Sequence, residues 1–183
     1  TSIYGSQKDI VFEDDAKFIN PQSPYAIAKV KEEKLLYKYH KKDLNFIILR
    51  FGTIHGYSIG MRFHTAVNKF IFQSVLNQNI TVWKTAMNQK RPYLSLLDAI
   101  RAIDFIISKN IFDNQIYNIL NDNFTVKEIL KKIKKRIKKI KIKFVETKIM
   151  NQLSYDVSNL KFKKLGFRYK NKIDNDINET IKA

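Results

Sequence analysis

Residues 23–29 are Ser23-Pro24-Tyr25-Ala26-Ile27-Ala28-Lys29, in which a helix start is followed by a tyrosine and a lysine four residues apart. Serine is a favoured N-cap, and proline suits the first position of a helix. Apolar residues continue at helical spacing, so we predict a helix from Pro24 to about Lys41. Positions four apart share one helix face, which places Tyr25 beside Lys29.

The Tyr25–Lys29 pair suggests acid/base chemistry on a hydroxyl or a ketone. A free tyrosine has a reference pKa of about 10 and is a poor base at neutral pH. A cation beside the phenol stabilises the phenolate and lowers that pKa. The alternative is a surface helix that carries both residues by coincidence, because Y-x-x-x-K spacing alone is a weak signal.

The segments around this helix predict a parallel α/β sheet. Residues 45–51 form an apolar run of strand length, followed by a turn-rich loop at residues 52–56. Residues 1–5, before the helix, are interpreted as the end of another strand. Strand, helix and strand in this order favour parallel pairing. Ligands of such sheets bind at the carboxyl ends of the strands, where Gly5 and Gly52 lie.

Several motifs in a fixed order point to one family. The motifs T-S-I-Y-G, S-P-Y-A-I-A-K and L-R-F-G-T-I-H-G resemble the extended short-chain dehydrogenase/reductases, more narrowly the NAD-dependent epimerase/dehydratase group acting on nucleotide sugars. Later motifs agree, the last of them K-K-L-G-F at residues 163–167, so the family's order and spacing of motifs hold from Thr1 to about Phe167. The resemblance implies an α/β fold in which residues 1–56 end a Rossmann-type NAD-binding domain. Residues 57–183 would form an interleaved, smaller substrate-binding α/β region, with 93–120 returning to the main sheet.

The amino-acid composition limits which class of protein this chain can belong to. The chain has 183 residues and is 44% hydrophobic, enough for a real core. It contains no cysteine, which excludes thiol chemistry and fits a reducing cytoplasm. No apolar run approaches the roughly 20 residues that span a membrane. We therefore expect a cytoplasmic protein without a membrane span.

The glycines indicate an incomplete cofactor site. There are five, and no G-x-x-G-x-x-G or G-x-G-x-x-G loop can be built from them. Dinucleotide folds use such a loop to bring backbone amides against a pyrophosphate. We therefore expect a C-terminal fragment of the family's enzyme that lacks the first βαβ units, and we expect this fragment alone to be inactive.

The net charge of +17 offers a rival interpretation. Nine of the thirteen residues from Lys131 to Lys143 are basic, as in a helix that binds nucleic acid. The isoleucines argue for a solvated helix face instead. Ile129, Ile133, Ile137 and Ile140 form one apolar stripe, and Thr125 with Glu128 predicts a capping box. No nucleic-acid motif accompanies the run, so we favour the solvated face.

The resemblance assigns catalytic and cofactor roles. Tyr25 would be the acid/base, and Lys29 would lower its pKa and hydrogen-bond the nicotinamide ribose. The family's third catalytic residue is a serine or threonine, here either Thr1 or a residue outside the chain, and we favour the second reading. The cofactor, NAD or NADP, would contact Tyr25, Lys29 and the strand-end residues Phe51, Gly52 and Thr53.

Substrate contacts follow from the same resemblance. Thr53 would face the sugar, Asn68 and Arg91 the phosphates, and Trp83 the nucleotide base. Each has a plainer alternative, such as a helix-surface position for Asn68 and a core anchor for Trp83. His55, where many relatives have tyrosine, is interpreted as a turn residue with its ring partly in solvent. Asp98 is predicted to be the N-cap of a helix ending at Ser108.

The function predicted is an NAD-dependent nucleotide-sugar epimerase that oxidises a sugar carbon, most often C4. Family dehydratases carry an acidic pair near the positions of Ser2 and Ile3. This chain has no carboxylate at either position, which argues for an epimerase or a reductase. A non-catalytic remnant and a basic nucleic-acid-binding module remain as alternatives. A nucleotide sugar would be the substrate, and the helix from Tyr25 to Lys41 could support a homodimer.

Overall fold

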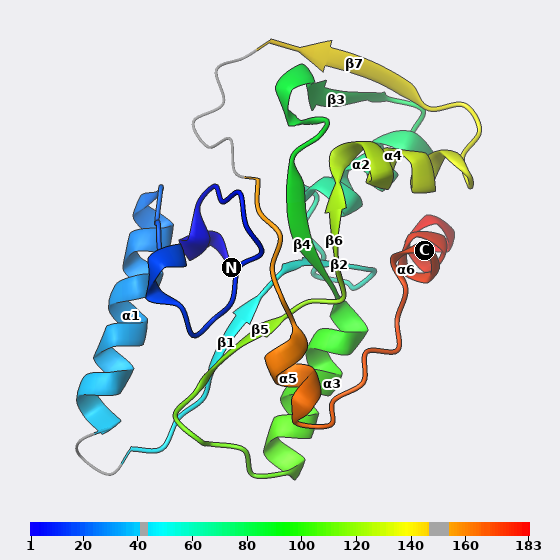
Figure 1. Ribbon diagram of the computed structural model, residues 1–183. Coiled ribbons are helices and arrows are strands. Elements are labelled where there is room, and N and C mark those ends of the chain that lie inside the picture. The colour runs from blue at the N-terminus through cyan, green and yellow to red at the C-terminus, as the bar shows by residue number, and fades with distance from the viewer. Residues whose placement is uncertain (41–43, 147–153) are drawn as a thin grey trace.

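The computed structural model describes residues 1–40, 44–146 and 154–183. Helices and strands are interspersed along the chain, as expected of an α/β protein (Figure 1). Their order is α1 (Pro24–His40), β1 (Ile48–Phe51), β2 (Thr53–His55), α2 (Ala66–Val75), β3 (Asn79–Trp83), β4 (Lys90–Ser95), α3 (Leu96–Ser108), β5 (Ile116–Ile119), β6 (Asp122–Thr125), α4 (Val126–Lys134), β7 (Lys141–Val145), α5 (Leu160–Lys164) and α6 (Ile173–Lys182).

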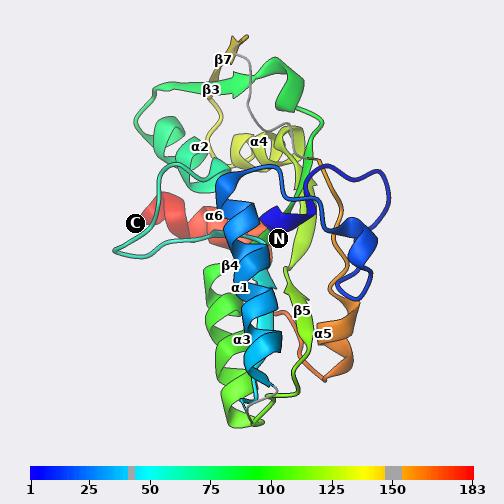
Figure 2. The same cartoon turned by 90° about the vertical axis from the view of Figure 1, so that its left-hand side faces the viewer.

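One half of the molecule is built on the parallel pair β1–β5. Ile48 lies opposite Ile116 and Phe51 opposite Ile119, so segments nearly 70 positions apart are in register. Figure 2 shows β5 between the helices α1 and α3 on one side and α5 on the other. Phe162 of α5 is fully buried against this pair and anchors the small helix. The division of the chain at residue 56, with residues 93–120 returning to the main sheet, stays a prediction.

The other half holds two small sheets and three helices. Strand β4 pairs in parallel with β2 and antiparallel with β6, while β3 pairs in parallel with β7. Helices α2, α4 and α6 bury one shared core beside β3. Because β2 follows β1 after a single residue, the two halves meet at the end of β1.

Helix α4 confirms the predicted capping box. The Thr125 hydroxyl accepts from the Glu128 backbone N–H at 3.2 Å, and the Glu128 carboxylate accepts from the Thr125 N–H at 2.7 Å. Ile129 and Ile133 are fully buried, and Ile137 and Ile140 pack on the same core after the helix has ended at Lys134. The isoleucine stripe therefore has a packing role, as the solvated-face interpretation requires.

A buried polar network joins α1, β1 and β5 to the N-terminal segment. Arg50 of β1 donates to both carboxylate oxygens of Glu33 on α1, at 2.9 and 2.6 Å, and to the Tyr4 hydroxyl at 2.8 Å. That hydroxyl donates in turn to Asn118 of β5 at 2.6 Å, and Asn118 donates to Glu13 at 3.1 Å. Burial raises the pKa of Tyr4 to about 12, so its proton stays in place to make this bond.

The network also corrects the interpretation of residues 1–5. They form no strand, because Ser2–Tyr4 is a short 3-10 helix that ends at Gly5 with φ of 62°. The turn points the Tyr4 ring into the protein, where it is fully buried. A Cβ at Gly5 would lie 2.3 Å from the Asn20 carbonyl oxygen, so glycine is required at this position.

Two other local predictions were wrong. Residues 53–55 were expected in a loop but form β2, because β4 offers a parallel partner. Helix α3 begins after Ser95, so Asp98 lies inside its first turn and is not the N-cap. Asp98 is fully buried and accepts from Asn121 at 2.6 Å and from the Asn171 backbone at 2.9 Å. It therefore ties the C-terminal segment to α3.

Replacing Arg50 with methionine should lower the free energy of unfolding by about 3 kcal/mol, because Glu33 would keep a buried charge without its partner. Tyr4→Phe should cost about 1–3 kcal/mol by removing one bridging hydroxyl. Urea denaturation measures both. The control is Lys17→Met, which breaks the exposed pair with Asp15 and should leave the midpoint nearly unchanged. Equal midpoints for Arg50→Met and the control would contradict the prediction.

Candidate active site

Tyr25 stands in the first turn of α1, near the end of β1. The Ser23 hydroxyl accepts from the Ala26 backbone N–H at 3.2 Å, which confirms the predicted N-cap. Ala26 is the buried contact of this turn, and Tyr25 beside it is 63% exposed. The phenol is therefore presented on the surface at the edge of two cavities.

Lys29 lies one turn further along the same helix. Its ammonium is 5.6 Å from the centroid of the Tyr25 ring and 2.7 Å from a carboxylate oxygen of Glu32. The hydrogen bond to Glu32 raises the pKa of Lys29, so the ammonium stays charged. An exposed pair of this kind contributes little to stability, so Lys29 can turn to another partner at small cost.

Three adjoining cavities connect most of the residues singled out in the sequence. The edge cavity, about 390 Å³ along β1, is lined by Thr1, Tyr25, Lys29 and Phe51 among others. The middle cavity, about 470 Å³, also includes Tyr25 and Phe51 and adds Gly52, Thr53 and Asn68. The aromatic cavity, about 310 Å³, includes Thr53 again and adds Trp83 and Arg91. Neighbouring cavities share lining residues, so the three lie in a row from α1 to β4, and this row is called the path.

The end of β1 forms the centre of this path. The Gly52 backbone N–H donates to the Ile119 carbonyl at 2.9 Å, and a Cβ at Gly52 would lie 3.1 Å from the Pro92 backbone. Close packing of β1 against β4 therefore explains this glycine without a ligand. Thr53 follows as the first residue of β2 and lines both the middle and the aromatic cavities.

Thr1 lines the edge cavity beside Tyr25. Its amino group donates to the Phe51 carbonyl at 2.9 Å. This contact accounts for Thr1 as a structural residue. Its catalytic role remains a prediction.

Asn68 is buried, so the helix-surface interpretation of this residue was wrong. Only 3% of it is exposed, and its Oδ1 accepts from the Gly56 backbone N–H at 3.2 Å. Gly56 has φ of 120°, a conformation that side chains rarely adopt. Asn68 thus holds the chain after β2 in place and lines the middle cavity from α2.

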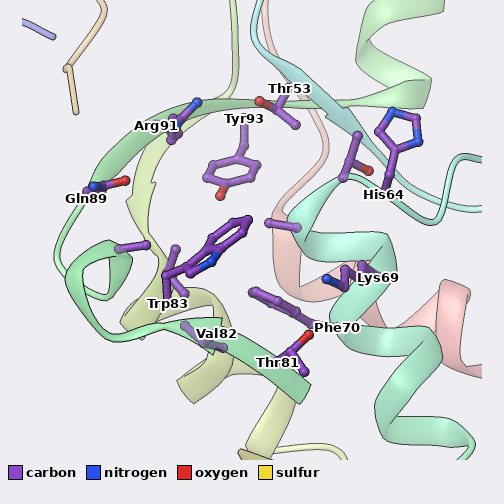
Figure 3. A pocket seen from close by; sticks show the side chains of 14 residues that line it. Thr53, His64, Lys69, Phe70, Thr81, Val82, Trp83, Gln89, Arg91 and Tyr93 are labelled. Atoms are coloured by element: carbon purple, nitrogen blue, oxygen red, sulfur yellow. The ribbon is translucent and has the colours of Figure 1, made fainter. Parts of the chain in front are cut away.

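Aromatic and cationic side chains surround the aromatic cavity (Figure 3). Trp83 is 41% exposed and is therefore no core anchor. Its indole lies across the middle of the view, with Arg91 of β4 on one side and Lys69 of α2 on the other. Burial raises the pKa of Tyr93 to about 12, so its hydroxyl remains protonated.

His64, Lys69 and Gln89 line the aromatic cavity but were not singled out in the sequence. The helical spacing could have indicated Lys69, because it lies three positions after the lining residue Ala66 and therefore on the same face of α2. His64 and Gln89 come from connecting segments, which carry no periodic signal.

His55 is buried, and the interpretation as a turn residue with a solvated ring was wrong. It ends β2, is 2% exposed, and its Nδ1 lies 3.2 Å from Asp176 Oδ2 of α6. Burial lowers the pKa of His55 to about 4, so the ring is neutral at pH 7. Burial raises the pKa of Asp176 to about 6, and the nearby charge of Asp98 raises it further.

Comparison with known proteins identifies the family. Residues 1–119 match the family model described as the NAD dependent epimerase/dehydratase family, so the chain belongs to that family. The uncharacterized protein MJ1055 of Methanocaldococcus jannaschii is 30% identical over 145 residues, covering 76% of this chain and 43% of that protein.

Solved structures confirm the α/β fold. UDP-glucose 4-epimerase of Thermus thermophilus, solved with NAD, superposes with a TM-score of 0.83 at 20% identity, over 99% of this chain and 60% of that one. UDP-glucuronic acid 4-epimerase of Bacillus cereus, solved with UDP-glucuronic acid and NAD, gives 0.81 at 22% identity, over 100% of this chain and 58% of that one. The chain thus spans about half the length of its relatives.

In the part of the chain that the structure describes, no helix is both long and apolar enough to cross a membrane.

Asp176→Asn should gain stability relative to the unmodified protein as pH rises. A carboxyl whose folded pKa is raised stabilises the fold only while protonated, so its contribution is complete below pH 3.8 and is lost as pH rises through 6. The asparagine variant lacks this loss. At about 1.4 kcal/mol per pKa unit, its relative gain should approach about 3 kcal/mol by pH 7.

Urea denaturation of both proteins at intervals from pH 4 to pH 7.5 measures this difference. A difference in unfolding free energy that stays constant across the range would show that Asp176 does not carry the raised pKa.

Proposed function

We propose that this chain belongs to an NAD-dependent nucleotide-sugar epimerase that acts at a sugar hydroxyl carbon, C4 by preference. One observation carries the proposal. Tyr25 and Lys29 stand at one end of a path of adjoining cavities, and Arg91 and Trp83 stand at the other. An acid/base pair and a phosphate-and-base site at the two ends of one path suit a sugar joined to a nucleotide.

Tyr25 would hold and move the proton. Its phenolate would take the proton of the sugar hydroxyl as that carbon is oxidised, and the phenol so formed would return the proton when the ketone is reduced from the opposite face. Lys29, released from Glu32, would place its ammonium beside the phenol and favour the phenolate. When bound, a nicotinamide cofactor supplies the acceptor and donor of hydride.

The residues present fit one end of such a cofactor. Tyr25, Lys29 and Phe51 line the edge cavity together, and Gly52 and Thr53 follow at the strand end. These groups would hold the nicotinamide and its ribose. The 183 residues contain no glycine-rich loop for the pyrophosphate, and NAD and NADP are not distinguished by the groups present.

The substrate would lie with its sugar in the middle cavity and its nucleotide in the aromatic cavity. Arg91, with its planar fork of donors, would bind the diphosphate, and Trp83 would stack on the base. Thr53, at the junction of the two cavities, would contact the sugar, and Asn68 would approach the phosphate from α2. The absence of a carboxylate at Ser2 and Ile3 favours epimerisation over dehydration. Such a reaction suits the cytoplasm, where nucleotide sugars are made.

Tyr25→Phe in the protein expressed from its native reading frame should lower turnover of UDP-sugars by about 10²–10⁴-fold, because the proton acceptor is removed. The conversion is followed by NMR of the C4 epimers, with NAD supplied. Substrate binding should change little.

The matched control is Tyr39→Phe, an exposed tyrosine on the same helix. It should retain full turnover. Unchanged turnover in Tyr25→Phe would reject Tyr25 as the acid/base, whereas an absence of turnover by the unmodified protein on every UDP-sugar would reject the epimerase proposal.

We also propose a homodimer through α1. Ile27 and Leu35 are exposed apolar residues about two turns apart on this helix. A second copy of the chain would bury both.

Leu35→Glu should therefore convert a dimer to a monomer in size-exclusion chromatography with light scattering. The control is Leu160→Glu, an exposed leucine on α5. A monomeric unmodified protein, or a dimeric Leu35→Glu protein, would reject the interface.

A further inference from the structure

The aromatic cavity has a one-sided charge. Its fourteen lining residues include Lys69 and Arg91, two fixed cations, together with His64. None of the fourteen is an aspartate or a glutamate. A cavity with two cations and no carboxylate attracts an anion, because nothing in its wall neutralises the positive charge.

Arg91 and Lys69 differ in their surroundings. Burial raises the pKa of the Tyr155 hydroxyl and the charge of Arg91 opposes this rise, which places the guanidinium close to the Tyr155 side chain. Lys69 is only half exposed, yet its ammonium has no ion pair or side-chain hydrogen bond with any residue in 1–40, 44–146 or 154–183. A half-buried lysine without a partner loses hydration that nothing in the protein replaces.

The two cations approach from different elements. Arg91 projects from β4 on one side of the cavity, Lys69 from α2 on the other, and the Trp83 indole lies between them (Figure 3). An anion between the cations would therefore also lie beside an aromatic platform. A nucleoside diphosphate has both parts, a planar base and two adjacent phosphates.

A single arginine leaves a diphosphate only partly neutralised. Among the residues that line the aromatic cavity, Lys69 is the one lysine that accompanies Arg91. We propose that Lys69 is the second cation of the diphosphate site and acts as a point charge opposite the bidentate Arg91. The inference rests on the proposed function and adds Lys69 to its binding residues.

Trp83 makes the site directly observable. It is the only tryptophan of the chain, so its fluorescence reports on the aromatic cavity alone. The experiment titrates the purified protein with UDP, UMP, uridine and inorganic pyrophosphate, and calorimetry confirms each affinity. Lys69→Met removes the charge but keeps most of the side-chain volume, and Lys69→Arg restores the charge. Lys127→Met is the control, because Lys127 is exposed next to the lining residue Val126 but does not line the cavity.

The expected loss of affinity increases with the number of phosphates on the ligand. Lys69→Met should weaken UDP binding about 10-fold and UMP binding less, and should leave uridine binding unchanged. Lys69→Arg should recover most of the UDP affinity, and Lys127→Met should bind all ligands normally. Unchanged UDP affinity in Lys69→Met, or an equal loss for uridine, would overturn the assignment of Lys69.

The same titrations can reject the proposed function while leaving the two-cation site in place. If the unmodified protein binds pyrophosphate as tightly as UDP and Lys69→Met weakens both equally, the two-cation site stands and the nucleotide-sugar proposal falls. If the unmodified protein binds neither, both proposals are overturned.

Discussion

The buried guanidinium of Arg50 is the constraint on which the rest of the structure depends. It binds Glu33 of α1 through two hydrogen bonds and the Tyr4 hydroxyl through a third. Tyr4 then reaches Asn118 of β5, so one side chain connects a helix, two strands and the N-terminal segment. A buried cation requires partners in fixed positions, because each missing bond would leave charge unsolvated.

This network has a functional consequence. Helix α1 buries only Ala26 in the core, so apolar contact holds it weakly. Glu33 lies two turns beyond Tyr25, and its bonds to Arg50 set the position of the helix along β1. The phenol of Tyr25 is thereby placed at the end of β1, where the edge and middle cavities meet.

Charge then distinguishes the two ends of the path. Around Tyr25, the edge cavity contains Lys29 and Arg50 together with Glu32 and Glu33, so its charges are balanced. The charged side chains that line the aromatic cavity are all cations. A ligand with a neutral reacting part and an anionic remote part would therefore be oriented by electrostatics before any close contact forms. This polarity supports the proposed direction of the nucleotide sugar along the path.

Local signals in the sequence were sufficient to predict a structural feature wherever a short segment satisfies its own hydrogen bonds. The N-cap Ser23 and the capping box of Thr125 and Glu128 were both predicted, because capping acts within a few residues. The family motifs also singled out Tyr25, Lys29, Thr53 and Arg91, and the structure places all four along the adjoining cavities. Positions that depend on distant partners could not be predicted this way. His55 is buried because α6, more than a hundred residues later, covers it with Asp176, and Gly52 is needed because the Pro92 backbone approaches it. Lys69 became a candidate only when folding placed α2 opposite β4, since no local pattern states which charges will face each other across a cavity.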